Sequence, residues 1–391
     1  MSKKHLLYVS PFWPVKSGIS EYSETLIWGL EKYFNVVLLT DNYKIQNKKI
    51  REHFEIIQYS EKNDYLGYDY IFYNFGNNPD AHEFMYDMIE KYPGYVILHD
   101  LSLYYLSTAH YMKKDMLYQK IYEMEGAEGL SLVKERIKEC SETDLLQFKE
   151  LSSRLWLNKE ILKCAKGIFV HSKYAADKIK ELGLNINTKK IHLVNCMPQI
   201  DLEGKDAFRK KYGLKLSDYV VASFGFIAPS KCNKLCCAAI NQYNVSHKDK
   251  IHYFMVGAGD YADDMLGEYI HKTGFTNNNE FFSAMNACDL VLNLRTDYNG
   301  ESSATLLQCM YMEKLCIVSK VGWFDELSDE IVLKIDENAT ENELAKLVVG
   351  CKNGQYDFMK GKAADFSRNK CSIEEISEDI YRLLSVEYGV V

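Results

Sequence analysis

The sequence predicts an α/β protein with two Rossmann-like halves, and three observations lead to this fold class. Short apolar runs alternate with longer amphipathic segments along the whole chain, a pattern typical of parallel β/α/β units. The alternation breaks at a polar, lysine-rich stretch near residues 198–216 and then starts afresh. The length of 391 residues also favours two domains, because it exceeds what one ordinary hydrophobic core contains.

In the first half, continuous apolar runs predict strands that helices cover on both faces. The predicted strands are 5–10, 35–40, 70–75, 95–100 and 167–172, and the predicted helices are 17–33 and 173–183. Residues 103–166 form a long, charged stretch with a helical pattern throughout. This stretch predicts a helical excursion at the edge of the first domain.

The second half repeats the pattern, with predicted strands at 219–226, 252–259, 289–295 and 315–322. The final segment, 372–389, begins with a serine, carries acids in its first turn and has an apolar stripe, which predicts a capped helix. Two Rossmann-like halves in one chain are expected to leave a cleft between them. Ligands of open α/β sheets bind at the carboxyl ends of the strands, so the site is expected there.

The composition of the chain argues against several classes of protein function. The net charge of −8 argues against nucleic-acid binding, and the longest apolar runs fall well short of the roughly 18–20 residues of a membrane-spanning helix. The start, MSKKHLLYVSPFWP, has the positive charge of a signal peptide, but its short apolar segment favours a first strand. The eleven cysteines are expected to be reduced thiols of a cytoplasmic protein. Cys232, Cys236 and Cys237 lack a second ligand pair at zinc-site spacing, so no metal is expected.

Two loops of the first half are candidate ligand sites. Ser17 and Gly18 would let backbone amides approach an anion at a helix N-terminus, or the glycine would simply serve an ordinary turn. His99 and Asp100 end a predicted strand, where side chains can touch a substrate. The alternative is that His99 is an interior residue and that Asp100 caps the following helix.

Two stretches of the second half have phosphate-binding features. Lys231 follows a predicted strand and could reach a phosphate as a point charge, or it is a solvated lysine at a helix start. The stretch VGAGDYADDM, residues 256–265, matches the G-x-G-x-x-A pattern of dinucleotide-binding loops. The match is mid-chain and Asp260 would repel a pyrophosphate, so that interpretation is not favoured.

The stretch NGESSATLLQCM, residues 299–310, combines a carboxylate with a predicted helix N-terminus. Ser302 and Ser303 are candidate N-caps, and the first amides of the helix would point a partial positive charge at an anion such as a diphosphate. Glu301 could then only accept hydrogen bonds from neighbouring hydroxyls, and phosphates beside hydroxyls describe a nucleotide sugar. The alternative for Glu301 is a carboxylate that caps its own helix.

Taken together, these segments resemble the family-4 retaining glycosyltransferases of the GT-B fold over nearly the whole chain. The motifs that carry the resemblance are SGISEYSETL, HDLSLYYL, FVHSKYAADKI, FGFIAPSK, NLRTDYNGESSATLL and KVGWFDELSD. The last two are similar to patterns of bacterial enzymes that build cell-surface polysaccharides. The resemblance implies two doubly wound Rossmann-like domains that face each other across a cleft. Residues 1–198 would form the acceptor domain, residues 199–371 the nucleotide-sugar donor domain, and residues 372–391 a helix that returns to the first domain.

The resemblance also implies a donor site. Gly18 would offer its amide to the phosphates, His99 would lie against the transferred sugar, Lys231 would hold the diphosphate and Glu301 would bind sugar hydroxyls. The residues implied for catalysis are His99, Lys231 and Glu301, and those implied for donor binding are Ser17, Gly18, Lys231, Arg295, Gly300, Glu301, Ser302, Ser303 and Gln308.

The chain departs from the family pattern at two places. The family usually has two glutamates separated by seven residues, whereas six residues separate Glu301 from Gln308, and the family spacing from Gln308 leads back to Gly300. A ribose contact by Gln308 would therefore come from a neutral amide. Phe226 occupies a position where the family often has arginine, and Arg295 is expected to supply the missing cation.

The expected activity is transfer of a sugar, with retention, from a nucleotide-diphosphate sugar to a glycan or lipid-linked glycan acceptor in cell-surface polysaccharide biosynthesis (EC 2.4 class), without a metal or other cofactor. The alternative is a catalytically silent protein that binds sugar nucleotides or glycans, which Phe226 and Gln308 motivate. Aromatic and basic residues interleave between Tyr104 and Lys120. This mixture can lie at a lipid interface, which would place the protein at the inner face of the membrane, or it can be an ordinary domain surface with solvated lysines.

Overall fold

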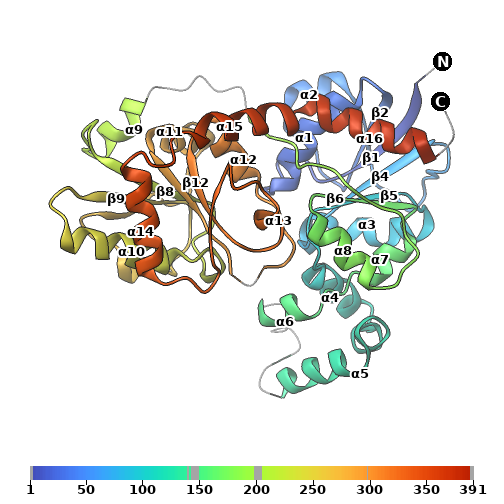
Figure 1. The fold of residues 1–391 in the computed structure, drawn as a ribbon. Coiled ribbons are helices and arrows are strands. Elements are labelled where there is room, and N and C mark those ends of the chain that lie inside the picture. Colours follow the sequence, from blue (N-terminus) through green and yellow to red (C-terminus); the bar gives the residue numbers. More distant parts are fainter. Residues whose placement is uncertain (1–2, 139–140, 142–148, 198–204, 297, 388–391) are drawn as a thin grey trace. The chain divides into compact units, whose positions relative to one another are not determined.

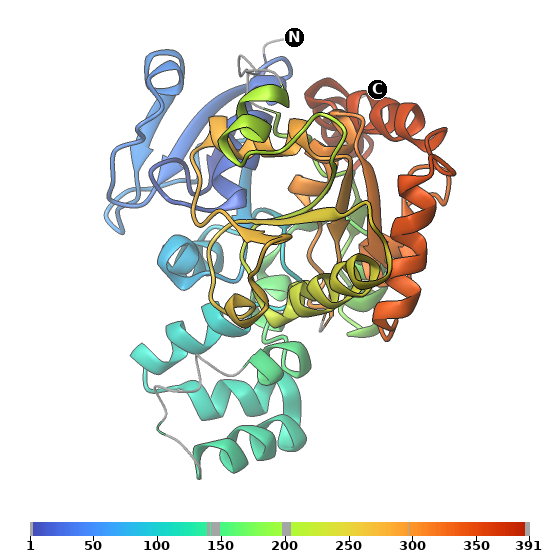
Figure 2. The same ribbon diagram turned by 90° about the vertical axis from the view of Figure 1, so that its left-hand side faces the viewer.

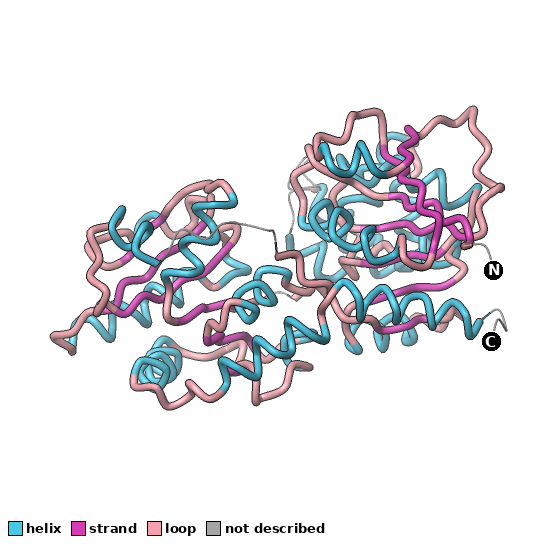
Figure 3. The backbone as a smooth tube through the Cα atoms, turned by 90° about the horizontal axis from the view of Figure 1, so that it is seen from above, coloured by secondary structure: helices cyan, strands magenta, loops and turns pink. Residues whose placement is uncertain are grey.

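The computed structural model describes residues 3–138, 141, 149–197, 205–296 and 298–387, and the chain divides into two compact units. Unit 1 comprises Met1–Val194, Asn299–Ser302 and Ile373–Val391, and unit 2 comprises Asn195–Tyr298 and Ser303–Ser372. The strands gather into two sets, one sheet for each unit (Figures 1 and 3). The division follows Val194, whereas the sequence predicted residue 198, which belongs to the segment 198–204 outside the described residues.

The sheet of unit 1 has the strand order β3-β2-β1-β4-β5-β6-β7, and its paired strands run parallel. The strands are β1 (Lys4–Val9), β2 (Phe34–Thr40), β3 (Glu55–Gln58), β4 (Tyr70–Phe75), β5 (Tyr95–Leu98), β6 (Gly167–Val170) and β7 (Thr188–Lys190). The chain runs outward from β1 to β3, returns to β4 beside β1, and continues the other way. The direction of winding therefore switches between β1 and β4, which is the doubly wound topology.

The helices of unit 1 pack on this sheet and on one another. They are α1 (Gly18–Leu30), α2 (Lys48–His53), α3 (Pro79–Lys91), α4 (Tyr104–Lys113), α5 (Leu117–Ile137), α6 (Lys149–Arg154), α7 (Lys159–Cys164), α8 (Lys173–Glu181) and α16 (Ile373–Glu387). The C-terminal helix α16 lies along α1 (Figure 1). Tyr381 stacks on Tyr33 with ring centroids 4.6 Å apart, and Glu374 pairs with Lys32 at 3.2 Å. Helix α16 thus completes the unit that begins with β1.

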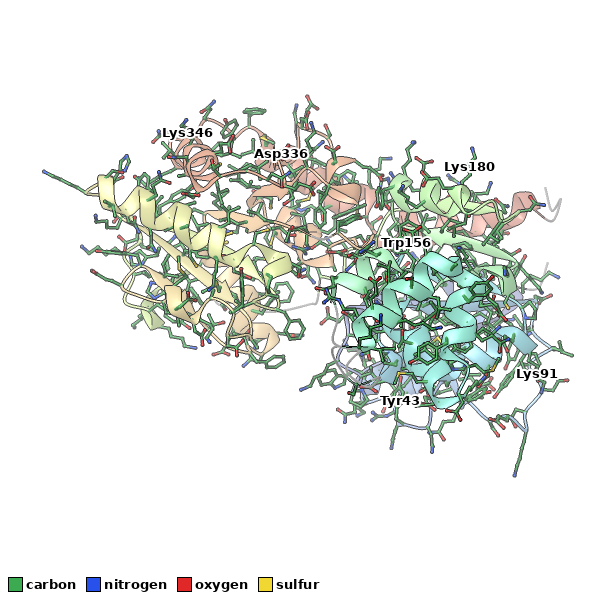
Figure 4. All side chains as sticks on the ribbon, turned by 90° about the horizontal axis from the view of Figure 1, so that it is seen from below. Tyr43, Lys91, Trp156, Lys180, Asp336 and Lys346 are labelled. Carbon is green, nitrogen blue, oxygen red and sulfur yellow. The ribbon has the colours of Figure 1, made fainter. Side chains whose placement is uncertain are left out.

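The helical excursion consists of α4, α5, α6 and α7, as the charged stretch 103–166 predicts for its described residues. Helix α5 is interrupted at Gly126, whose φ of 70° is not helical. The start of the excursion is joined to its later part, because Leu103 donates its backbone N–H to the carbonyl of Trp156 at 2.7 Å. Figure 4 labels Trp156 in this part of the chain. Asn158 also donates to the carbonyl of Leu101 at 2.7 Å.

The sheet of unit 2 has the strand order β10-β9-β8-β11-β12-β13, again with parallel pairs. Its strands are β8 (Tyr219–Phe224), β9 (Ile251–Val256), β10 (Ile270–Lys272), β11 (Leu290–Asn293), β12 (Leu315–Ser319) and β13 (Leu333–Ile335). The chain winds from β8 to β10 on one side and from β11 to β13 on the other. The switch point of this sheet therefore lies between β8 and β11.

The helices of unit 2 form layers against its sheet, and α10 lies beside α14 (Figures 1 and 2). The helices are α9 (Lys205–Lys211), α10 (Asn233–Ser246), α11 (Asn278–Ala287), α12 (Ala304–Tyr311), α13 (Gly322–Asp325), α14 (Glu341–Lys352) and α15 (Met359–Asp365). Short 3₁₀ turns cover Pro229–Lys231 and Asp263–Met265, and a π-helical turn covers Phe366–Lys370. Each unit has its own buried hydrophobic core.

The α/β fold class and each strand predicted from an apolar run are confirmed. The sequence did not reveal four strands, β3, β7, β10 and β13, and these are the two edge strands of each sheet. An edge strand has a neighbour on one side only, so its side chains need not be apolar on both faces. The residues of β3 and β7 are mostly half-buried or exposed, which explains why they lack an apolar run.

Candidate functional site

The carboxyl ends of β8 and β11, at the switch point of unit 2, carry two cationic side chains that line one narrow pocket. Lys231 comes from the loop after β8 and Arg295 from the loop after β11. The backbone N–H of Thr296 donates to the carbonyl of Ser230 at 3.1 Å and joins the two loops. The pocket is lined by Ser223, Phe224, Gly225, Phe226, Lys231, Asn233, Leu292, Asn293, Leu294 and Arg295. Two cations in one pocket suit a polyanionic group such as a diphosphate.

The loop that carries Lys231 is held by Asn233, the first residue of α10. Its side-chain oxygen accepts from the backbone N–H of Ala228 at 3.0 Å, and its amide nitrogen donates to the Ser223 hydroxyl at 3.4 Å. That hydroxyl also contacts the Tyr253 hydroxyl at 2.7 Å. Asn233 and Tyr253 are buried, so Lys231 extends from a loop with a fixed base.

Arg295 is a buried arginine, with 5% of its surface exposed. Its backbone N–H donates to the hydroxyl of Ser319 at 2.8 Å, and its guanidinium donates to the carbonyl of Leu294 at 2.7 Å. The guanidinium also lies 5.1 Å from the ring centroid of Phe324. Arg295 lines the same pocket as Lys231, as expected for a second cation, while Phe226, which was compared with an arginine of the family that the sequence resembles, is 77% exposed. The role in donor binding stays a prediction.

The G-x-G-x-x-A stretch serves the packing of two loops. A Cβ at Gly257, whose φ is 156°, would lie 1.9 Å from the carbonyl oxygen of Gly225. The glycine thus lets the loop after β9 approach the loop after β8. The residues that follow form the 3₁₀ turn Asp263–Met265, where a dinucleotide-binding loop needs the N-terminus of a long helix.

Helix α12 begins as predicted from the serine pair. Ser303 is its N-cap and accepts from the backbone N–H of Leu306 at 3.2 Å, and Asn293 donates to the same hydroxyl at 3.3 Å. Ser302 precedes the cap. Gln308, in the middle of α12, is buried, and its amide nitrogen donates to the carbonyl of Cys196 at 3.0 Å. Gln308 therefore uses its donor inside unit 2, and its predicted ribose contact stays a prediction.

The segment Asn299–Ser302 belongs to unit 1 by its contacts, although the sequence predicted it within the donor domain. Gly300 has a φ of 89°, and a Cβ at this position would lie 2.4 Å from Cβ of Leu101. Glu301 is half-buried and accepts from the backbone N–H of Asn299 at 3.1 Å. The alternative in which Glu301 caps α12 is wrong, because the N-cap is Ser303. Gly300 and Glu301 thus lie beside the loop that follows His99 in the sequence.

Ser17 and Gly18 lie after β1, at the switch point of unit 1. Ser17 is the N-cap of α1, and its hydroxyl accepts from the backbone N–H of Ser20 at 3.1 Å. Gly18 is exposed, and among the described residues no atom lies within 4 Å of a Cβ built on it. The turn therefore does not need glycine for lack of space, and the approach of a ligand to its amide stays a prediction.

His99 lies at the end of β5 in a row of hydrogen-bonded side chains. Its Nε2 is 3.2 Å from Oδ1 of Asn74, and its Nδ1 is 3.3 Å from Nε2 of His171. Asn74 also accepts from the Tyr8 hydroxyl at 3.2 Å. Burial, and then the neighbouring His171, hold the pKa of His99 well below its usual range. Burial likewise lowers the pKa of His171 to about 4, so both rings are neutral at pH 7.

Asp100 does not cap the helix that follows. Its Oδ2 accepts from the backbone N–H of Asn77 at 2.9 Å, and the N-cap of α4 is Leu103. Asn77 in turn accepts from the backbone N–H of Tyr105 at 2.8 Å. The alternative in which Asp100 caps the following helix is therefore wrong, since its carboxylate stabilises the loop after β4.

Three residues of this row were missed by the sequence analysis. Tyr8 lies on β1, Asn74 on β4 and His171 directly after β6. The signal that marked His99, a polar residue at the carboxyl end of an apolar run, is also present at Asn74 and His171. Applying that criterion to every predicted strand of the first half would have found both.

The remaining predictions concern metals, thiols and membranes. Within the described residues, no group of three or more His, Cys, Asp and Glu side chains could hold a metal ion, and the ten cysteines are free thiols. None of the helices in the described parts of the chain is long and apolar enough to cross a membrane. In the interleaved stretch, Tyr104, Tyr111 and Leu117 are buried, and the contact with a lipid interface stays a prediction. The lysines that pair with acids there are Lys113 with Glu83, Lys114 with Asp87, and Lys120 with Glu123 and Glu160.

Two doubly wound α/β units with parallel sheets define a GT-B fold. Comparison with solved structures agrees. Anabaena HepE in complex with UDP-glucose has a TM-score of 0.65 at 15% identity, over 98% of this chain and 100% of that chain. Sucrose-phosphate synthase from Thermosynechococcus elongatus has a TM-score of 0.66 at 14% identity, over 99% and 100%. WaaG, a glycosyltransferase involved in lipopolysaccharide biosynthesis, has a TM-score of 0.59 at 13% identity, over 97% and 99%. No family model and no curated protein matches the chain.

Proposed function

We propose that the protein is a retaining glycosyltransferase that uses a nucleotide-diphosphate sugar. The observation that carries this proposal is the pocket at the carboxyl ends of β8 and β11, whose lining includes the two cationic residues Lys231 and Arg295. Open α/β sheets bind ligands at such a switch point. The solved neighbours support the proposal, since they include glycosyltransferases and a protein in complex with UDP-glucose.

Cleavage of the anomeric C–O bond leaves negative charge on the departing nucleotide diphosphate. Lys231 and Arg295 would stabilise this charge, together with the first amides of α12 behind Ser303. Loss of one contact to developing charge typically raises the barrier by roughly 2.7–4 kcal/mol. In the retaining reaction that we propose, the leaving phosphate takes the proton of the attacking acceptor hydroxyl.

In unit 1, the backbone amide of Gly18 at the start of α1 would meet the donor phosphates. Glu301, which is half-buried, would accept hydrogen bonds from the sugar hydroxyls through its carboxylate. His99 has both ring nitrogens in hydrogen bonds within the protein, so its contact with the sugar would be made by the face or edge of a neutral ring. In this proposal His99 lines the sugar site and does not act as a general acid or base.

We further propose membership of family 4 and an acceptor that is a glycan or lipid-linked glycan of the cell surface. The motifs around residues 293–307 and 320–329 support this assignment. The likeness to WaaG, which is involved in lipopolysaccharide biosynthesis, agrees with it. We place the reaction in the cytoplasm, with an acceptor at the inner face of the membrane, and we expect no metal requirement.

The test has two steps. A panel of nucleoside diphosphates, beginning with UDP, is screened for a rise in the thermal midpoint, because a ligand that binds only the folded state stabilises it. The matching nucleotide sugars are then incubated with the protein, with and without EDTA, and release of free nucleotide is measured. Release above background supports the enzyme. Binding without release would favour the silent binding protein, and binding of no nucleotide would reject both.

A further inference from the structure

A row of hydrogen-bonded side chains runs along the carboxyl edge of four neighbouring strands in unit 1. Tyr8 belongs to β1, Asn74 to β4, and His99 and His171 follow β5 and β6. These strands are consecutive in the sheet order β1-β4-β5-β6. The row connects the hydroxyl of Tyr8 to Asn74, Asn74 to His99, and His99 to His171 over distances of 3.2, 3.2 and 3.3 Å.

The chemistry of Asn74 determines which nitrogen of His99 carries the proton. The amide nitrogen of Asn74 donates to the carbonyl of Val9 at 3.4 Å, so its oxygen faces Tyr8 and His99. A side-chain amide oxygen can only accept. His99 must therefore donate through Nε2–H. Since a neutral imidazole has one donor and one acceptor, Nδ1 of His99 is the acceptor, and Nε2 of His171 must donate to it.

The two histidine rings pack against one tyrosine, with His99 half-buried. Tyr22 of α1 contacts His99 edge-on with centroids 4.6 Å apart and contacts His171 at 5.5 Å. His171 is 4% exposed. Burial disfavours a charge on either ring, in agreement with the lowered pKa of both histidines. Removing the donor from His171 would leave the Nδ1 lone pair of His99 without its partner, and the ring of His99 could then turn.

We propose that His171 is a positioning residue that holds the ring orientation of His99, while Asn74 sets its tautomer. This inference rests on the proposed function, in which His99 lies against the transferred sugar. The sugar gains positive character as the anomeric bond breaks, so a charged imidazolium beside it would oppose the reaction. Burial keeps His99 neutral, and the hydrogen bond from His171 holds the ring so that its N–H is directed at Asn74 and away from the sugar.

Two variants separate the hydrogen bond from the space that the ring fills. His171→Phe keeps a ring against Tyr22 but has no donor, and His171→Gln keeps an N–H donor without the ring. Both are compared with the unsubstituted protein by thermal midpoint, by ¹⁵N spectra of ring-labelled histidine and by release of nucleotide from the donor. We expect Nε2 of His99 to stay protonated in both variants, because Asn74 still accepts from it. The ¹⁵N signature of the unprotonated Nδ1 should shift in His171→Phe, where its hydrogen bond is lost, and be retained in His171→Gln.

We also expect kcat to fall about three- to tenfold in His171→Phe, as for one lost hydrogen bond, with the KM of the donor little changed. The Gln variant should recover most of this loss. The same His171→Phe change in a His99→Gln background should have no further effect on kcat, because the two residues act as one unit. An equal loss in both backgrounds, or an unchanged His99 signature in His171→Phe, would overturn the positioning role.

The two proposals fail in different ways. If the unsubstituted protein releases no nucleotide from any donor that binds, the proposed function is rejected and the positioning role in catalysis goes with it, although the spectra still show the tautomer. If release occurs and His171→Phe leaves both kcat and the His99 signature unchanged, the proposed function stands and only the role of His171 is rejected.

Discussion

Gln308 donates its side-chain amide to the backbone carbonyl of Cys196 over 3.0 Å, and both residues are buried. Nearby, the backbone N–H of Asn195 donates to the carbonyl of Cys371 at 2.7 Å. The side chain of Asn195 donates to Ser367 at 2.8 Å. These bonds hold the first and the last segments of unit 2 against each other and against α12. A residue that the family pattern assigns to the ribose thus has a structural partner in this chain.

Replacing Gln308 by glutamate should therefore destabilise unit 2 without improving donor affinity. A carboxylate facing the carbonyl of Cys196 lacks the donor, and loss of a buried partner costs about 1–3 kcal/mol, more for a charged group. The thermal midpoint measures the first effect and nucleotide titration the second. Gln308→Met, which removes the bond without adding charge, should destabilise less. Tighter nucleotide binding by Gln308→Glu would show that the side chain contacts the ribose after all.

Lys231→Met should weaken nucleotide binding and lower kcat by roughly a hundred- to a thousandfold, as for loss of one contact to developing charge. Lys234→Met is the matched control. Lys234 lies three residues further along on α10, but it pairs with Asp264 at 2.9 Å and does not line the pocket. The stabilisation of each variant by UDP and its release of nucleotide give the two measurements. Equal effects of the two substitutions would mean that net charge, rather than the pocket, attracts the nucleotide.

The fold was predictable wherever burial requires a continuous apolar run in the sequence. Strands β4 and β9 are buried along nearly their whole length and consist of apolar runs, and Ser303 caps α12 as its chemistry suggests. The edge strands are too exposed and too short for this signal: β7 and β13 have three residues each. The sequence alone therefore predicts the central strands of each sheet but not its edge strands.

The candidate site was predictable only in part, because its partners come from distant parts of the sequence. Lys231 and Arg295 each follow a predicted strand, yet only the strand order makes those strands neighbours. Nothing in the sequence shows that Gly300 packs on Leu101, nor that His99 shares its nitrogens with Asn74 and His171. A local pattern identifies a reactive side chain, whereas its hydrogen bonds depend on the complete sheet.

Gly300→Ala should disturb the segment that carries Glu301. The φ of 89° is unfavourable for alanine, and the new Cβ would lie 2.4 Å from Leu101, so we expect a loss of about 1–3 kcal/mol and weaker donor binding. Gly18→Ala is the comparison, because among the described residues no atom lies within 4 Å of its new Cβ. Its thermal midpoint should not change, while nucleotide affinity should fall if the phosphates approach the amide closely. An unchanged midpoint in Gly300→Ala would contradict the packing on Leu101.

Buried neutral histidines should make the stability of unit 1 fall as the pH drops below neutrality. Burial lowers the pKa of His171 to about 4 and that of His82 to about 3, whereas an unfolded histidine titrates near 6.5. Between these values the unfolded chain binds more protons than the folded chain, so stability is full above about pH 6.5 and is lost progressively toward pH 4.

Urea midpoints of the unsubstituted protein, measured from pH 7.5 to pH 5, should therefore decrease with falling pH. This range stays above the titration of most carboxylates, whose usual pKa is about 4. His171→Phe removes one of the titrating groups and should flatten the decrease, even though its midpoint at pH 7.5 is lower. Identical slopes for the two proteins would mean that His171 can take up a proton in the folded state near its ordinary pKa. Such a histidine could not serve as the neutral donor to His99.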